Sequence, residues 1–231
     1  MCAEQVSKLI VAIDGPAGAG KSTVAKRLAK ELGYTYMDTG AMYRAFAWKV
    51  MKEGIDLSDE KKLERVLQDT SIELLEQDGR SSVLLNGVDV TDRIRTPELS
   101  QLASRVSTSK IVRERMVELQ RDMGSHGGVV AEGRDIGTVV FPNAEVKVFL
   151  DASSEERARR RFEELRSQGR EVTVEETLEE MEQRDRRDRE RDVAPLRKAE
   201  DAVVIDSTQA GVDGVVGRIM QEIKRKQSAI Q

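Results

Sequence analysis

The sequence is poor in several residue types, and each shortage narrows the class of protein. Aromatic residues make up only 3% of the 231 residues, so aliphatic side chains must fill the interior. There is one cysteine, Cys2, so no disulfide can form within the chain, which is typical of a reducing compartment. Nothing near Cys2 would stabilise a thiolate, and we expect no reactive-thiol role for it. The only histidine, His126, lies among glycines, and we interpret it as a loop residue.

Long hydrophobic runs are also missing. Near the N-terminus only 9–13 is apolar before charge and glycine intervene, so we expect no signal peptide. No apolar run approaches the roughly 20 residues that span a bilayer, and we expect a cytoplasmic protein without membrane contact. The formal net charge of −4 argues against a general binder of nucleic acid or anionic membranes.

Short apolar segments alternate with amphipathic ones, which indicates an α/β fold. With 39% hydrophobic residues the chain can form a globular core. Near the N-terminus, strand, loop and helix follow one another twice, with helices predicted over 21–32 and 41–53, and a last helix is predicted over 211–226. Five segments read as buried core strands: 9–13, 34–37, 129–131, 146–150 and 203–205.

The middle of the chain breaks this rhythm. Within 71–90 two short strands flank an Asp-Gly pair, which predicts an antiparallel hairpin, and 96–123 reads as two helices. We therefore expect a small inserted α+β subdomain over 63–124. The core domain then consists of 1–62 and 125–231.

The segment Gly15 to Thr23 matches the Walker A pattern, with a strand before it and a helix beginning within it. Glycines let backbone N–H groups approach phosphate oxygens, and the helix N-terminus adds partial positive charge. Lys21 can reach the β- and γ-phosphates, and the Ser22 hydroxyl can ligate Mg²⁺. We expect this loop to bind a nucleoside triphosphate with Mg²⁺; it comprises Gly15, Pro16, Ala17, Gly18, Ala19, Gly20, Lys21, Ser22 and Thr23.

Two clusters after predicted strands provide groups for a second, anionic substrate. Loops at the carboxyl ends of parallel strands face the binding crevice, which places 38–44 there. In this cluster Thr39 is predicted to cap a helix, and Arg44 projects a positive charge. In the second cluster, Glu132 follows a strand where Mg²⁺ is usually held, and Arg134 can clamp an acceptor phosphate. Taken singly, a capped helix or a simple turn also explains each cluster.

A third cluster lies in the highly charged helical segment 155–191, which we expect to break near Gly169. Arg184, Asp188 and Arg191 are spaced i, i+4, i+7 and are predicted to share one helix face. Most charge runs are only solvated faces. In a kinase, however, such arginines can close over the transferred phosphoryl group, neutralise it and exclude water.

Together these segments resemble the bacterial cytidylate kinases, over about 9–226. The matching strings are 13–23, 38–44, 132–142, 149–154 and 184–196, and those beginning at Gly133 and Arg184 are far more specific than the phosphate loop. The resemblance implies a P-loop NTPase fold with five parallel strands flanked by helices, and a helical lid at about 155–191. It also implies that the insertion shapes the monophosphate site, and that ATP phosphorylates CMP and dCMP.

The resemblance further implies roles for matching residues. The cytosine would be faced by Thr39, Arg113, Asp135 and Arg191, the sugar by Ser104, Arg184 and Asp188, and the acceptor phosphate by Arg44 and Arg134. Mg²⁺ would be held by Ser22 and Glu132, and ATP would be met from the lid by Arg157, Arg160 and Arg161. The catalytic set would be Lys21, Arg134, Asp135, Arg184 and Arg191. Thr39 stands where relatives can carry serine, and Glu132 where others carry aspartate.

The chemistry of a carboxylate beside a guanidinium suits cytosine and leaves uracil badly paired, which can cost a few kcal/mol in a dry site. Two other interpretations remain open. One is a P-loop kinase for another small acceptor, such as UMP or shikimate. The other is an RNA-associated P-loop protein, although residues 184–192 hold five arginines against four acids. We expect a monomer whose partners are small molecules.

Overall fold

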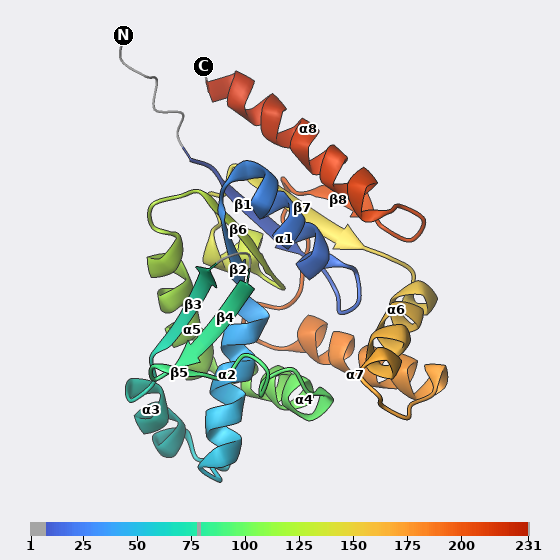
Figure 1. Ribbon diagram of the computed structural model, residues 1–231. Helices are drawn as coiled ribbons and strands as arrows, with labels where there is room; N and C mark the ends of the chain where they lie inside the picture. Colours follow the sequence, from blue (N-terminus) through green and yellow to red (C-terminus); the bar gives the residue numbers. More distant parts are fainter. Residues whose placement is uncertain (1–7, 78–79, 231) are drawn as a thin grey trace.

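The computed structural model describes residues 8–77 and 80–230 (Figure 1). Its central sheet has five parallel strands in the order β2-β6-β1-β7-β8, as the sequence predicts. The strands are β1 (Ile10–Asp14), β2 (Thr35–Asp38), β6 (Val129–Gly133), β7 (Val146–Asp151) and β8 (Val203–Asp206). The first two strands to form a βα unit, β1 and β2, are separated in the sheet by β6, so the chain crosses over between them.

Helices cover both faces of this sheet because its strands are apolar on both sides. On one face, α1 (Lys21–Leu32) and α8 (Val212–Ile230) pack Leu28 and Ile219 against the strands. On the other face lie α5 (Lys110–Gly124) and the π-helical turn η1 (Ile136–Val140). The predicted α1 is found with the same bounds, while α8 extends beyond its predicted end.

A second apolar core lies in the insertion. It is centred on side chains such as Phe46, Leu99 and Met116, all buried. The predicted hairpin and helix pair are present, with a short third strand that the sequence did not predict. The elements around this core are α2 (Thr39–Lys52), α3 (Glu60–Gln68), β3 (Ile72–Gln77), β4 (Arg80–Leu85), β5 (Val88–Asp89), α4 (Pro97–Val106) and α5.

The predicted domain boundary stays a prediction, and two features of the fold bear on where it falls. A division between 62 and 63 cuts α3, which begins at Glu60 with the carboxylate of Asp59 as its N-cap. In addition, α2 contributes Phe46 and Val50 to the core of the insertion although it follows β2 of the main sheet. The assignment of the insertion to monophosphate binding stays a prediction.

The charged segment forms two helices, α6 (Ser154–Ser167) and α7 (Val174–Glu190), which pack on each other at one side of the molecule (Figure 1). The predicted break near Gly169 is confirmed, since this residue is left-handed with φ 76°. A capping box between Thr173 and Glu176 starts α7. One expectation is wrong: α7 ends at Glu190, and Arg191 has extended backbone, so it does not share a helix face with Arg184.

Two residues that the sequence singled out are not part of the elements described above. Cys2 lies outside the described residues. His126 is an exposed residue between α5 and β6, as expected of a loop position. Within 8–77 and 80–230, no helix has both the length and the apolar composition needed to cross a bilayer.

Candidate functional site

The loop between β1 and α1 is built to hold an anion. Gly18 and Gly20 have φ of 74° and 88°, and a Cβ on Gly18 would lie 2.9 Å from the Arg157 carbonyl oxygen. The Lys21 ammonium is buried and donates to the Pro16 carbonyl oxygen at 2.6 Å. Burial and the nearby charge of Arg134 lower the pKa of Lys21 to about 7. An anion in the loop would therefore favour the charged form of Lys21.

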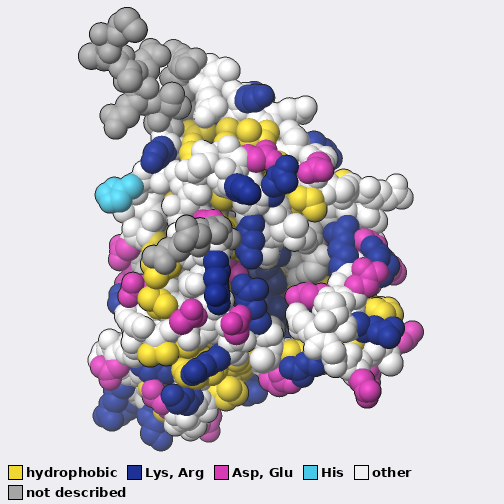
Figure 2. All heavy atoms as spheres, in the orientation of Figure 1, with side chains coloured by type: hydrophobic (Ala, Val, Ile, Leu, Met, Phe, Trp, Pro, Cys, Tyr) yellow, Lys and Arg dark blue, Asp and Glu magenta, His cyan; other side chains and the backbone are white. Residues whose placement is uncertain are grey.

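Beside this loop lies a pocket of about 400 Å³, walled by the loop, the start of α2, α4, the end of β6 and the lid. Lys and Arg side chains gather in the hollow at the centre of the molecule (Figure 2). The predicted residues that line it are Ala17, Gly18, Lys21, Ser22, Thr39, Arg44, Ser104, Arg113, Glu132, Arg134, Asp135, Arg161, Arg184, Asp188 and Arg191. Residues on the wall that the predicted set did not contain include Lys26, Tyr43, Arg95, Ser100 and Ser107.

Asp135 is the centre of a buried charge cluster on the wall of the pocket. One carboxylate oxygen pairs with Arg113 of α5, and the other lies 3.5 Å from a guanidinium nitrogen of Arg191. Both arginines also donate to Ser107, at the end of α4, each at 3.4 Å. Tyr43 lies under the Arg113 guanidinium, 5.7 Å from ring centre to Cζ, and burial raises the pKa of Tyr43 to about 12.

The next wall is a chain of charges that runs from the β6 end to the lid. Arg134 donates through Nε to Asp188 at 2.8 Å. Burial alone would raise the pKa of Asp188, but the nearby charges of Arg134, Arg184 and Arg191 outweigh it and lower this pKa. Asp188 is therefore ionised. In contrast, the Arg184 Nε is buried without a partner among the described residues, and burial and Arg134 lower the pKa of Arg184 to about 10. The charges of Asp188 and Asp185 favour the charged form of Arg184 but do not fully offset these effects.

At the start of α2 the sequence placed the cap on the wrong residue. Asp38 is the N-cap, since its carboxylate accepts from the Ala41 N–H at 2.8 Å and from Arg44 at 3.0 Å. Thr39 is in the first helical turn, and its hydroxyl donates to the Glu132 carbonyl oxygen at 2.7 Å. The carboxylate one residue earlier reaches the free N–H groups, so the threonine hydroxyl turns toward β6 and the pocket.

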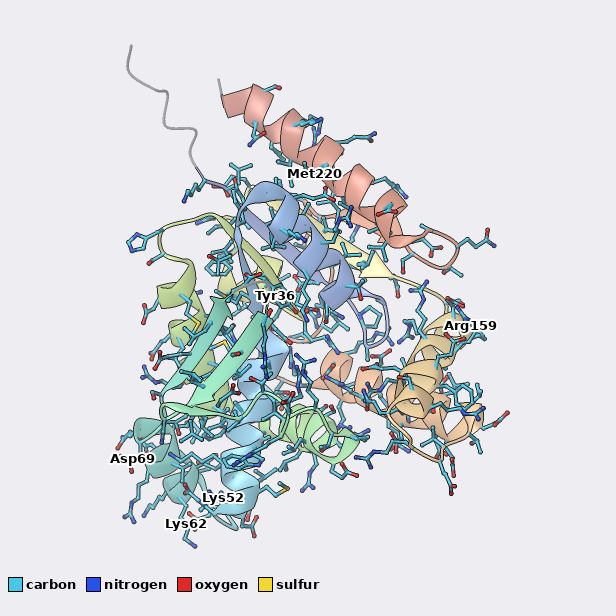
Figure 3. The ribbon with its side chains drawn as sticks, viewed as in Figure 1. Tyr36, Lys52, Lys62, Asp69, Arg159 and Met220 are labelled. Atoms are coloured by element: carbon cyan, nitrogen blue, oxygen red, sulfur yellow. The ribbon has the colours of Figure 1, made fainter. Side chains whose placement is uncertain are left out.

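Glu132 lies at the end of β6 rather than after it, as the sequence had suggested, and its side chain is buried. The Tyr36 hydroxyl, labelled at the centre of Figure 3, donates to it at 2.5 Å. Burial and the charge of Asp38 raise the pKa of Glu132, while Lys21 and the Ser22 hydroxyl oppose this shift. One carboxylate and one hydroxyl beside a phosphate loop fit Mg²⁺, which usually takes few protein ligands and completes its shell with phosphate and water. Elsewhere in the described chain there is no group of three or more metal-ligating side chains.

The lid arginines divide into three environments. Arg157 is buried and donates to the Ala17 carbonyl oxygen at 3.0 Å and to Asp185 at 2.5 Å, so it ties the lid to the phosphate loop without lining the pocket. Arg160 donates to Ser207, whose hydroxyl in turn donates to the Ala19 carbonyl oxygen at 3.0 Å. Arg161 lines the pocket.

Two other residues of the lid lie in different surroundings. Arg159 lies at the outer edge of α6 in Figure 3 and pairs only with glutamates of its own helix. Asp185 is buried and accepts from the Ala17 N–H at 3.2 Å. The sequence did not predict this role, because Asp185 is indistinguishable from the solvated acids around it.

The strand, the glycine loop and the helix that follows it, set in a five-stranded parallel sheet, define a P-loop nucleotide-binding protein. A family model described as cytidylate kinase matches residues 11–225. The chain is 52% identical over 220 residues to a cytidylate kinase of Syntrophotalea carbinolica, covering 95% of this chain and 94% of that protein. It is 51% identical over 219 residues to that of Bacillus subtilis, covering 95% and 98%. The chain belongs to the cytidylate kinase family.

Solved structures support the fold independently. An uncharacterized protein from Eubacterium ventriosum superimposes with a TM-score of 0.52 at 15% identity, covering 94% of this chain and 99% of that chain. A gluconokinase from Sinorhizobium meliloti gives 0.51 at 15% identity, covering 98% and 97%. At this identity the likeness concerns the fold alone.

Proposed function

We propose that this protein transfers the γ-phosphoryl group of ATP to the phosphate of CMP or dCMP, giving ADP and CDP or dCDP. Membership of the cytidylate kinase family supports the reaction. The observation that carries it is the position of Asp135, held by Arg113 and Arg191 on the wall of the pocket that also contains Lys21 and Ser22. The residues that would bind the cytosine and the loop that would bind the ATP phosphates thus line the same pocket.

Asp135 would accept the amino group of cytosine, and the neighbouring guanidinium groups would donate to its ring acceptors. Uracil presents a carbonyl where cytosine presents an amino group, so it would meet the Asp135 carboxylate with an acceptor. The Thr39 hydroxyl lies on the same wall and completes the polar contacts to the base. Ser104 and Asp188, which form a pair at 3.4 Å, would face the sugar.

The acceptor phosphate would lie among Arg44, Arg134 and Arg184, three cations that line the pocket. It would add an anion beside Arg184, whose charge burial disfavours, and the positive field would neutralise the two phosphates as they approach. An acceptor phosphate is already a nucleophile, so positioning matters more than a strong base. Lys21 and the loop N–H groups would hold the ATP phosphates, and α6 and α7 would exclude water.

Mg²⁺, when bound by Ser22 and Glu132 together with the ATP phosphates, supplies charge that offsets the transferring phosphoryl group. Tyr36 holds the Glu132 carboxylate by the hydrogen bond to Oε1, which leaves Oε2 for a metal or its water. Arg157, Arg160 and Arg161 would support ATP from the lid, the first two through the backbone of the loop. The monomeric state and the cytoplasmic location stay predictions.

The test is an assay that couples ADP release to NADH oxidation, with CMP, dCMP, UMP, AMP and shikimate as separate acceptors. We expect CMP and dCMP to stimulate turnover strongly, UMP weakly, and the other two not at all. Turnover without CMP stimulation would overturn the proposal, and stimulation by shikimate alone would favour the other kinase interpretation. Salt-sensitive RNA binding without acceptor-dependent turnover would favour the RNA-associated interpretation.

A further inference from the structure

Arg187 is a half-buried residue of α7 that lies next to Asp188 in sequence but outside the predicted site. Its Nε donates to the Ser104 hydroxyl at 3.3 Å, and another of its guanidinium nitrogens donates to the Gln101 side chain. Both acceptors belong to α4, across the pocket wall from α7, and neither carries a charge. The arginine therefore acts on the orientation of neutral groups rather than as half of an ion pair.

The partners of Ser104 determine where its proton points. A guanidinium has donors only, so the Ser104 oxygen must accept from Arg187. The carboxylate of Asp188 is ionised and has acceptors only, so the Ser104 hydroxyl must donate to it, at 3.4 Å. Both contacts are long for hydrogen bonds, but the chemistry of the two partners allows only this one direction.

The result is a pair of groups that offers the pocket acceptors and no donor. Ser104 has one lone pair left, and Asp188 keeps free lone pairs after accepting from Ser104 and from Arg134 at 2.8 Å. Both side chains are buried and line the pocket, which leaves those acceptors to a ligand. Two adjacent hydroxyl donors match them, and a ribose carries such a pair while a 2′-deoxyribose does not.

We propose that Arg187 is a positioning residue that makes the sugar site favour ribose over deoxyribose. By donating to one lone pair of Ser104, it keeps the Ser104 hydroxyl proton pointing toward Asp188 and so keeps the Ser104–Asp188 pair as an acceptor of two sugar hydroxyls. Without Arg187, the Ser104 hydroxyl gains rotational freedom, and the second acceptor is no longer in place. This inference rests on the proposed function.

The test compares CMP with dCMP in the wild type, Arg187→Met, Ser104→Ala and the double variant. Methionine keeps an unbranched stem and removes every donor. We expect Arg187→Met to lower kcat/KM for CMP about 5- to 10-fold, mainly by raising KM, because one hydrogen bond is lost. The value of kcat/KM for dCMP should fall less than about 2-fold. Because Arg187 acts through Ser104, the double variant should be no worse than Ser104→Ala alone.

A matched control separates orientation from simple packing of α7 on α4. Gln101→Ala removes the other partner of Arg187 and should leave the ratio of kcat/KM for CMP to kcat/KM for dCMP unchanged. The positioning role of Arg187 would be overturned if Arg187→Met lowered kcat/KM equally for CMP and dCMP. It would also be overturned if the losses of the two single variants added up in the double variant. If Arg187→Met lowers the melting temperature by several degrees, Arg187→Gln is the second variant to measure, since its shorter amide does not reach Ser104 in the same geometry.

The two levels of the hypothesis fail differently. Absence of CMP-dependent turnover in the wild type overturns the proposed function together with this inference. Normal wild-type turnover with an unchanged CMP-to-dCMP ratio in both Arg187 variants overturns only the role of Arg187.

Discussion

Arg113 and Asp135 form an ion pair whose side chains are only 2% and 7% exposed, although they come from α5 and from the loop after β6. Asp135 also faces Arg191, so one carboxylate offsets two buried guanidinium groups. Burial of this kind costs desolvation energy, and a lost partner leaves an uncompensated charge. In the proposed function the pair therefore links recognition of the base to the stability of the fold.

Replacing Asp135 by asparagine should affect both properties. We expect the free energy of unfolding in urea to fall by about 3–5 kcal/mol, because two arginines lose their buried counter-charge. The preference for CMP over UMP should fall by about 10-fold or more, because an amide can present either a donor or an acceptor. Asp201→Asn removes an exposed partner of Lys147 and should cost at most about 1 kcal/mol. Equal behaviour of the two variants would contradict the expectation.

Arg184 and Arg157 should respond in opposite ways to the same substitution. The Arg184 Nε is buried without a partner among the described residues, so Arg184→Met should leave the free energy of unfolding unchanged or raise it by up to ~2 kcal/mol. Its kcat should fall about 100-fold, because a cation near the phosphates is lost. Arg157→Met strands Asp185 and should lower stability by about 3 kcal/mol. Calorimetry measures the stability of each variant, and the coupled assay measures its kcat. A large loss of stability in Arg184→Met would contradict the prediction.

Lys21 has a matched control on the same helix. Lys21→Met should lower kcat/KM for CMP about 1000-fold, because the only side-chain cation of the loop is removed. Its burial already disfavours the charge, so the melting temperature should hardly change. Lys30→Met, at an exposed position of α1, should leave both quantities within experimental error. Retention of more than a tenth of the activity in Lys21→Met would contradict the role of this lysine.

The stability of the fold should depend on pH through Asp14. This carboxylate accepts from the N–H groups of Ile136 and Gly137, each at 2.8 Å, and burial raises its pKa from 3.8 to about 6. The folded protein therefore binds more protons than the unfolded chain between about pH 4 and 6. Stability from this group is highest below that window and is lost as pH rises through it, by up to about 3 kcal/mol.

Asp14→Asn cannot titrate and isolates this effect. The difference in unfolding free energy between wild type and variant, measured in urea, should shift against the wild type by about 3 kcal/mol from pH 4 to pH 7. Asp206→Asn, at an exposed position of β8, should show no such shift over the same range. A constant difference between wild type and Asp14→Asn would mean that Asp14 does not titrate in this window.

The sequence predicts the parts of this protein that local chemistry determines. Short, mostly apolar segments identify all five strands, and the glycine pattern ending in Lys21 indicates the start of α1. Most of the resemblance-based site residues line one pocket. The ends of β1, β2 and β6 bring some of them to the same edge of the sheet, whereas others come from helices of the insertion and the lid.

The remaining features depend on contacts between distant residues. The π-helical turn η1 is anchored by Asp14, 122 residues before Ile136, and no local pattern near 136 indicates it. Arg187 and Asp185 belong to a run in which almost every residue is charged, and only the packing of α7 shows which of them turn inward. The cap of α2 depends on a competition between neighbouring side chains that composition alone does not resolve.

The helix α2 begins at the pocket with Thr39 and Arg44 and ends inside the apolar core of the insertion, where Phe46 and Val50 are buried. In the proposed function Arg44 contacts the acceptor phosphate, so this one helix would connect that contact with the core of the insertion. A movement of the insertion relative to the sheet would then carry Arg44 with it and change the contact. Loss of a methyl group from the core of the insertion should therefore change the affinity for the acceptor.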